Sequence, residues 1–202
     1  MAFTPTGSNY TRLSSTSGSA TVPLQTGDTP VRVTLSSTFT NSGATVYSAA
    51  TSGTRNNFGV TADGLDLLQA NTGTNASSSL GQLLVIAFDR PVTNVRFRLT
   101  GFTQNAVAGN TFRDAVWAST APTTQTKNTT TGLTVTGSGT QLSPWLAPNG
   151  TNSPEARYVD LTYSGPISSL SFRYFNSAGA ATSGQAISIG NMTFNAYGAV
   201  NC

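Results

Sequence analysis

Two tryptophans are the side chains of this sequence best suited to stack on a ligand. A flat indole can cover the face of a sugar and offers an N–H donor, which makes Trp117 and Trp145 candidate ligand contacts. Trp145 lies between Pro144 and Leu146, close to stretches typical of loops, and is expected to be exposed. The alternating stretch around Trp117 also suits a position in the core, so both roles remain open for that residue.

Two arginines, Arg98 and Arg173, occupy the same place in two similar stretches of the chain. Guanidinium groups on matched strands could offer a planar surface with many donors to a sugar or a carboxylate. The alternative, which we favour, is that each arginine covers the sheet and pairs with a nearby acid such as Asp89 or Asp160.

Asp63 and Asp66 are the candidate ligands for a cation, because they lie close together on either side of Gly64. Calcium prefers several oxygen ligands from one loop. The dipeptide Asp63-Gly64 is also typical of a tight turn, and this alternative is favoured. Apart from calcium, no cofactor is expected.

The composition removes the commonest catalytic arrangements. The chain has no histidine, which excludes Ser–His–Asp and Cys–His nucleophiles and the commonest zinc ligand. The single cysteine, Cys202, is the last residue, so no internal disulfide is possible. A carboxylate pair could hydrolyse glycosides, but the available acids are better explained as turn residues or arginine partners: Asp63, Asp66, Asp89, Asp114, Glu155 and Asp160. We predict a protein without enzymatic activity.

The elements that must position these residues are dominated by a repeated stretch. Residues 83–99 read LLVIAFDRPVTNVRFRL, and residues 159–174 read VDLTYSGPISSLSFRY. At one constant offset Pro91 falls on Pro166, Phe97 on Phe172 and Arg98 on Arg173. Each copy predicts an apolar strand, a turn marked by proline, and a strand of strict alternation. Phe97 and Phe172 should be equivalent core residues, and the two copies should pair within one domain.

The charge pattern bounds the partners and the location. Charged residues are only 8% of the chain, and the net charge is +3. The nine arginines and one lysine are scattered, which argues against a nucleic-acid partner. No apolar segment is long enough to insert in a membrane. A surface solvated by Ser, Thr, Asn and Gly favours a secreted or cell-surface protein.

The predicted fold is all-β: a single antiparallel β-sandwich of jelly-roll type with a duplicated strand-turn-strand unit. Short alternating stretches such as VRVTLSSTFT at residues 31–40, separated by Gly, Asn and Ser turns, support this class. Residues 1–17 are rich in Ser, Thr and Gly and are predicted to be a flexible N-terminal arm, with the sandwich over residues 18–202.

Two pairs of segments resemble a known kind of domain. The first is FDRPVTNVRFRLTGF with FRDAVWAS, and the second is SGPISSLSFRYFN with AISIGNMTF. Over residues 80–194 the chain resembles jelly-roll, galactose-binding-like domains of bacterial secreted and adhesin-type proteins. The resemblance implies binding or display rather than a reaction. Such domains often carry an acidic residue after the first repeated strand, where a cation could bind; residues 100–103 here read TGFT, without a carboxylate.

The functional prediction is a non-enzymatic, surface-exposed binding or display module, an adhesin or a carbohydrate-binding domain. Its expected partner is a glycan or a protein of a host or cell surface. The alternative is a structural subunit of an extracellular fibre, appendage or virion shell, which would self-assemble by adding its N-terminal arm as a strand to a neighbouring copy.

Overall fold

The computed structural model describes residues 2–3, 9–24, 28–40, 44–46, 57–61, 64–71, 78–79, 81–107, 110–148, 156–178 and 184–196. Its strands are β1 (Ala2–Phe3), β2 (Tyr10–Ser14), β3 (Ser17–Val22), β4 (Val31–Thr40), β5 (Ala44–Val46), β6 (Val60–Thr61), β7 (Gly64–Asn71), β8 (Gly81–Thr100), β9 (Gln104–Val107), β10 (Asn110–Ala118), β11 (Thr124–Lys127), β12 (Trp145–Leu146), β13 (Tyr158–Tyr163), β14 (Ile167–Asn176), β15 (Gly184–Ile189) and β16 (Met192–Asn195). Within these ranges no helix is long and apolar enough to cross a membrane.

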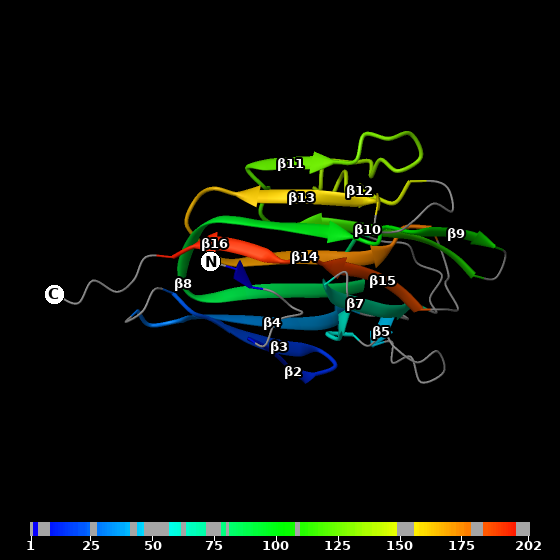
Figure 1. The fold of residues 1–202 in the computed structure, drawn as a ribbon. Helices are drawn as coiled ribbons and strands as arrows, with labels where there is room; N and C mark the ends of the chain where they lie inside the picture. Colours follow the sequence, from blue (N-terminus) through cyan, green and yellow to red (C-terminus); the bar gives the residue numbers. More distant parts are fainter. Residues whose placement is uncertain are drawn as a thin grey trace.

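Strand β8 organises the fold because it belongs to two sets of hydrogen-bonded strands, here called the first and the second ladder. Its first part pairs with β4 and β14, while its last residues pair with β13, β15 and β16. In Figure 1 the strand doubles back on itself at the left of the molecule. The predicted turn at Pro91 is therefore a bend within one long strand. Pro91 follows the last pair with β4, Val33 with Phe88, so its missing N–H breaks no bond of that ladder.

The two ladders have different strand orders, and every pair in them is antiparallel. The first ladder runs β12-β10-β14-β8-β4-β3-β2. The second ladder runs β11-β13-β8-β15-β7-β5 and also holds β16 and β1. The two copies of the repeat pair with each other, as predicted: β13 lies along the end of β8, and β14 lies along its beginning.

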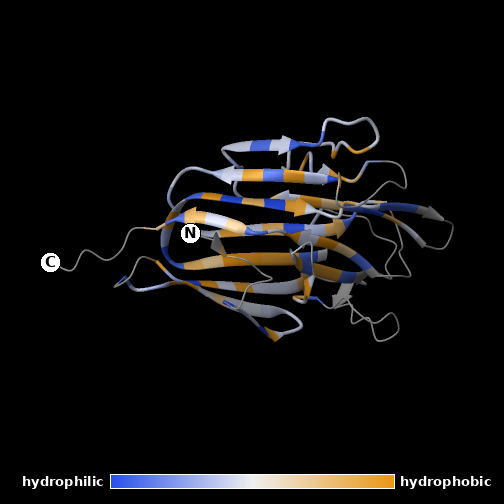
Figure 2. Ribbon diagram, viewed as in Figure 1, coloured by the Kyte–Doolittle hydropathy of each residue, from blue (hydrophilic) through white to orange (hydrophobic). Residues whose placement is uncertain are grey.

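The core forms where apolar side chains of the two ladders meet. Phe97 in the second ladder and Phe172 in the first are both buried, and their ring centroids lie 5.6 Å apart, edge to face. Phe88 and Phe194 make a similar contact at 5.3 Å. Figure 2 shows hydrophobic and hydrophilic residues alternating along the last part of β8 and along β13, as expected when one side of each strand is buried. The predicted equivalence of Phe97 and Phe172 is confirmed.

The N-terminal residues that the structure describes lie within the sheet and not apart from it. Phe3, in β1, pairs with Met192 of β16 and is fully buried. Strand β2 pairs with β3, and the Tyr10 hydroxyl donates a hydrogen bond to the Phe58 carbonyl. Strands β1 and β2 therefore occupy part of residues 1–17, the stretch predicted as a flexible N-terminal arm. Ser and Thr, which dominate this stretch, are compatible with strands as well as with loops.

We expect truncation of either core phenylalanine to destabilise the protein strongly. Phe97→Ala and Phe172→Ala should each lower the free energy of unfolding by about 3–5 kcal/mol, because each leaves a cavity between the ladders. The two losses should couple in a double-mutant cycle, since the rings are in contact. Arg96→Ala, one residue away on the exposed side, is the control and should cost little. Urea unfolding measures all three; a larger loss for Arg96→Ala would contradict the observed register.

Candidate functional site

Trp145 is fully buried, so the prediction of an exposed indole is wrong. Its indole N–H donates to the Gln125 side-chain oxygen at 2.6 Å, which links the edge strands of the two ladders. Gly139 packs against the ring so closely that a Cβ there would lie 2.1 Å from the indole. The turn that precedes Trp145 thus folds back over it. The flanking Pro144 suggested a loop, but composition does not reveal which side chain a loop covers.

Trp117 and Arg173 are brought together on the outer side of the first ladder. They lie directly opposite each other on β10 and β14, and both are half-buried. The Trp117 indole N–H donates to the Ser78 carbonyl at 2.5 Å. Trp117 is therefore neither fully buried in the core nor fully exposed to a ligand, which were the two predicted alternatives.

Arg98 and Arg173 lie on opposite outer sides, and no joint guanidinium surface forms. Because Phe97 and Phe172 point toward each other in the core, the residue after each one points away from it. Arg98 and Arg173 hold equivalent positions in the two copies of the repeat, which suggested a joint surface, but these positions place the two guanidinium groups apart.

Arg98 instead belongs to a set of three side chains on the second ladder. Its Nε and Nη2 donate to the two carboxylate oxygens of Asp160 at 2.7 and 2.8 Å, so the pairing with a nearby acid is confirmed. Its guanidinium also lies over the Tyr158 ring, 3.7 Å from the centroid. The hydrogen bond to Asp160 raises the pKa of Arg98 above its ordinary value. With 46% of the Arg98 side chain and 40% of the Asp160 side chain exposed, a fixed polar group faces solvent.

Arg96 lies beside this set and lines an open depression. The depression has a volume of about 320 Å³ and is lined by Asn94, Arg96, Thr193, Phe194 and Asn195. The register between β16 and β8 shifts between Thr193 and Asn195, which is a β-bulge. Asn94 has φ 52°, the left-handed conformation that Asn adopts more readily than most residues. The bulge therefore sets Asn94 out of the regular ladder at the edge of the depression.

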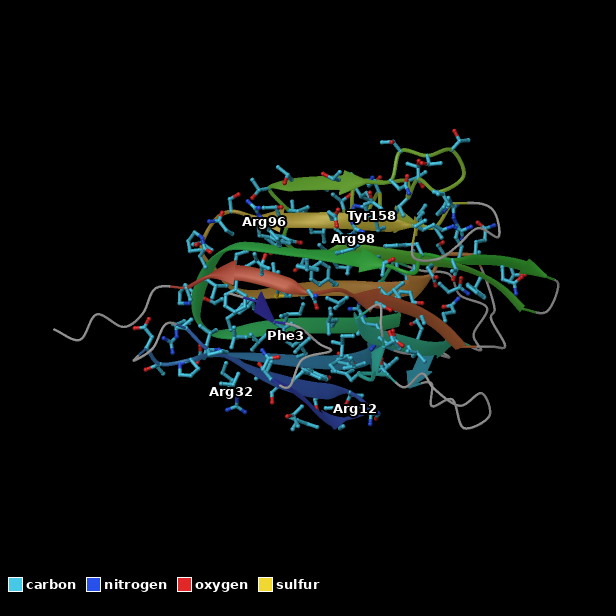
Figure 3. The ribbon with its side chains drawn as sticks, in the orientation of Figure 1. Phe3, Arg12, Arg32, Arg96, Arg98 and Tyr158 are labelled. Carbon is cyan, nitrogen blue, oxygen red and sulfur yellow. The ribbon has the colours of Figure 1, made fainter. Side chains whose placement is uncertain are left out.

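One surface, here called the arginine face, is formed by Arg98 with Asp160 and Tyr158 and by the outward residues of the neighbouring depression, which are Asn94, Arg96, Thr193 and Asn195. Figure 3 shows Arg96, Arg98 and Tyr158 over β8 and β13, far from Arg12 and Arg32 on the lower strands of the view. Pairing of Arg96 with Thr162 and Thr193, and of Arg98 with Asp160, places all of these residues on the same side. Among the ligand and metal contacts predicted from the sequence, and as far as the structure describes them, Arg98 alone belongs to it, together with Asp160, which was named as a possible partner of an arginine. The alternation of Tyr158, Asp160 and Thr162 was the available signal for the others, but it did not show which strand β13 would join.

Of the two aspartates predicted to bind a cation, Asp63 and Asp66, the structure describes only one. Asp66 is fully buried in β7, where its Oδ1 accepts hydrogen bonds from Ser188 at 2.6 Å and Thr61 at 3.3 Å. Asp63 lies outside the residues that the structure describes. Across those residues, no three acidic, cysteine or histidine side chains gather into a metal-binding group. Asp66 therefore acts as a hydrogen-bond acceptor within a strand and not as part of a turn.

Asp114 is the most unusual of the other carboxylates. It is fully buried; one oxygen accepts hydrogen bonds from the Thr103 N–H and hydroxyl at 2.7 and 2.8 Å, and the other accepts one from the Tyr174 hydroxyl at 2.8 Å. Desolvation raises the pKa of Asp114 to about 7, outweighing these hydrogen bonds and the attraction of Arg157. With no surface exposed, this carboxyl has a structural position, tying β10 to β14 and to the loop at Thr103. Asp89 pairs with Arg90 at 3.3 Å, and Glu155 lies outside the described residues.

No protein-family model matches the chain, and comparisons with curated proteins and with solved structures give no match.

We expect stability to fall with rising pH because of Asp114. Its pKa of about 7 in the folded protein exceeds the ordinary value of 3.8, so folding favours the protonated form. The resulting stabilisation is complete below about pH 4 and is lost as pH rises to about 7. The chain has no histidine to titrate in the upper part of this window. Urea midpoints from pH 4 to 8 should therefore decline and then level off.

Asp114→Asn should remove most of the decline in the urea midpoint with rising pH, because the amide is neutral at every pH between 4 and 8. Asp89→Asn, which changes an exposed carboxylate paired with Arg90, is the matched control and should keep the slope. A slope that survives unchanged in Asp114→Asn would show that another group causes it.

Proposed function

We propose that the chain is a non-enzymatic binding module of an extracellular or cell-surface protein and that it binds a glycan through the arginine face. The finer fold class, a β-sandwich of jelly-roll type in which the two ladders are the two layers, is part of this proposal. The observation that carries it is the exposed Arg98, held by Asp160 and Tyr158 beside the Arg96 depression.

The chemistry of the arginine face suits sugar hydroxyls. Arg98 is a planar donor whose orientation is fixed at two carboxylate oxygens and over one ring, so less side-chain freedom is lost when a ligand binds. Asn94, Asn195 and Thr193 add groups that both donate and accept hydrogen bonds. An open depression of this kind suits one or a few sugar units at the surface of a larger glycan.

Binding is favoured over catalysis by the positions of the described carboxylates. A glycosidase needs two carboxyl groups that reach the substrate from either side of the scissile bond. Of the five described carboxylates, Asp66 and Asp114 are fully buried, Asp89 and Asp160 are each held by an arginine, and Asp28 is exposed. None of the five lines the depression.

Self-assembly is the second candidate, and one observation supports it. Strand β2 pairs only with β3 among the described strands, and Leu13 in β2 is 61% exposed. An unpaired edge with an exposed apolar residue can accept a strand from another copy.

Light scattering across a range of protein concentrations separates the two candidates. A monomer at all concentrations would contradict assembly, whereas growing polymers would support it.

The binding proposal predicts that glycan affinity depends on the geometry of Arg98. The unmodified chain should bind a subset of glycans on an array, and Arg98→Lys should weaken that binding about tenfold or more. Lysine keeps the charge but loses the fork that meets Asp160 and the plane that covers Tyr158. Stability should change little, since exposed ion pairs contribute only about 0–1 kcal/mol.

The matched control is Arg32→Lys, because Arg32 is an exposed arginine on β4 in the first ladder. Its glycan profile should equal that of the unmodified chain. A blank array for the unmodified chain, or equal binding by both variants, would contradict the proposal.

A further inference from the structure

The charges of the arginine face are unevenly compensated. Arg98 is neutralised by Asp160, and Arg90, at the bend of β8, pairs with Asp89. Arg96 is exposed and makes no ion pair with any described residue. Its neighbours across the ladder are Thr162 on one side and Thr193 on the other, which are both neutral. Counting the described part of the chain, the depression therefore carries one positive charge with no acidic partner.

The groups around Arg96 match a small planar anion. A guanidinium meets a carboxylate with two parallel hydrogen bonds, which fixes the plane of the ligand group as well as its charge. The carboxamides of Asn94 and Asn195 and the hydroxyl of Thr193 line the same depression and can bind hydroxyl groups on the rest of a sugar. The Phe194 ring between Thr193 and Asn195 is buried against Phe88 in the core, so the side chains that the depression offers to a ligand are polar.

Charge also bears on which anionic polymer fits. A nucleic acid or a sulfate-rich polysaccharide carries many charges and is bound by rows of cations. Among the described residues of this face a single cation makes no ion pair, because the next arginine on the strand is already paired with an acid. Arg96 and Arg98 are two residues apart on one side of β8, about 6.5–7 Å along the strand. One acidic sugar at Arg96 and a neutral part of the glycan at Arg98 suit this spacing.

We infer that the depression beside Arg96 binds the carboxylate of an acidic sugar, so that the glycan recognised by the arginine face contains a uronic or sialic acid. This inference rests on the proposed function, since it names the class of glycan bound at the same face. Arg96 is the residue that binds the carboxylate, and Asn94 and Asn195 hold the hydroxyl groups beside it.

The test compares ligands that differ only in their charge. Affinities of the full chain are measured by calorimetry for oligogalacturonate and its methyl ester, and for sialyllactose and its methyl ester. We expect at least one acid to bind about tenfold or more tightly than its neutral partner. Arg96→Gln should remove that preference while leaving the neutral ligand's affinity nearly unchanged. Arg32→Gln is the control and should keep the preference, because Arg32 lies on the other ladder.

The possible failures have separate meanings. If neutral glycans bind but neither acid is preferred, or if Arg96→Gln keeps the preference, the inference is overturned and the proposed function stands. Binding of sulfated sugars without any carboxylate-bearing sugar would also overturn it. If no glycan binds at all, both the inference and the proposed function fail. Unchanged thermal unfolding of Arg96→Gln, expected for an exposed side chain, verifies that a loss of preference is not a loss of folding.

Discussion

The fold depends on the continuity of β8 through its bend. One strand donates and accepts hydrogen bonds in both ladders, so the position of the bend sets how the ladders lie relative to each other. Pro91 occupies the bend, where a missing N–H is tolerated. The second copy of the repeat completes the arrangement, because β13 and β14 pair with the two ends of β8 in turn. The core phenylalanines Phe97 and Phe172 lie on these segments.

The arginine face is a consequence of this arrangement. Once Val95, Phe97 and Leu99 are buried, the intervening arginines must project outward from the same strand. Strand β13 then brings an acid to one arginine and a hydroxyl to the other, which makes them chemically different. The bulge with β16 opens a depression beside only one of them. The asymmetry on which the proposed recognition of a single charge depends therefore comes from the neighbouring strands.

The interior is apolar around Phe97 and Phe172 and polar near the first residues of β8. Gln82 donates hydrogen bonds to Ser37 and Asn57, and Gln69 donates one to Gln185 at 3.2 Å. All five side chains are buried. Such networks stabilise a fold only when their geometry is kept, because a buried polar group that loses its partner costs about 1–3 kcal/mol. This end of the protein therefore depends on specific polar contacts in addition to apolar burial.

The sequence by itself determined which side of each repeated strand is buried, because alternation is a local property of an extended chain. It therefore predicted the core position of Phe97, the outward position of Arg98 and the pairing of the two copies. Tertiary structure decided the burial of Trp145, the separation of Arg98 from Arg173 and the bulge at Asn94. It also brought Asp160 to Arg98 across 62 positions of the chain. These features depend on the register between distant strands and on which loop covers which ring, and a shift of one residue would reverse them.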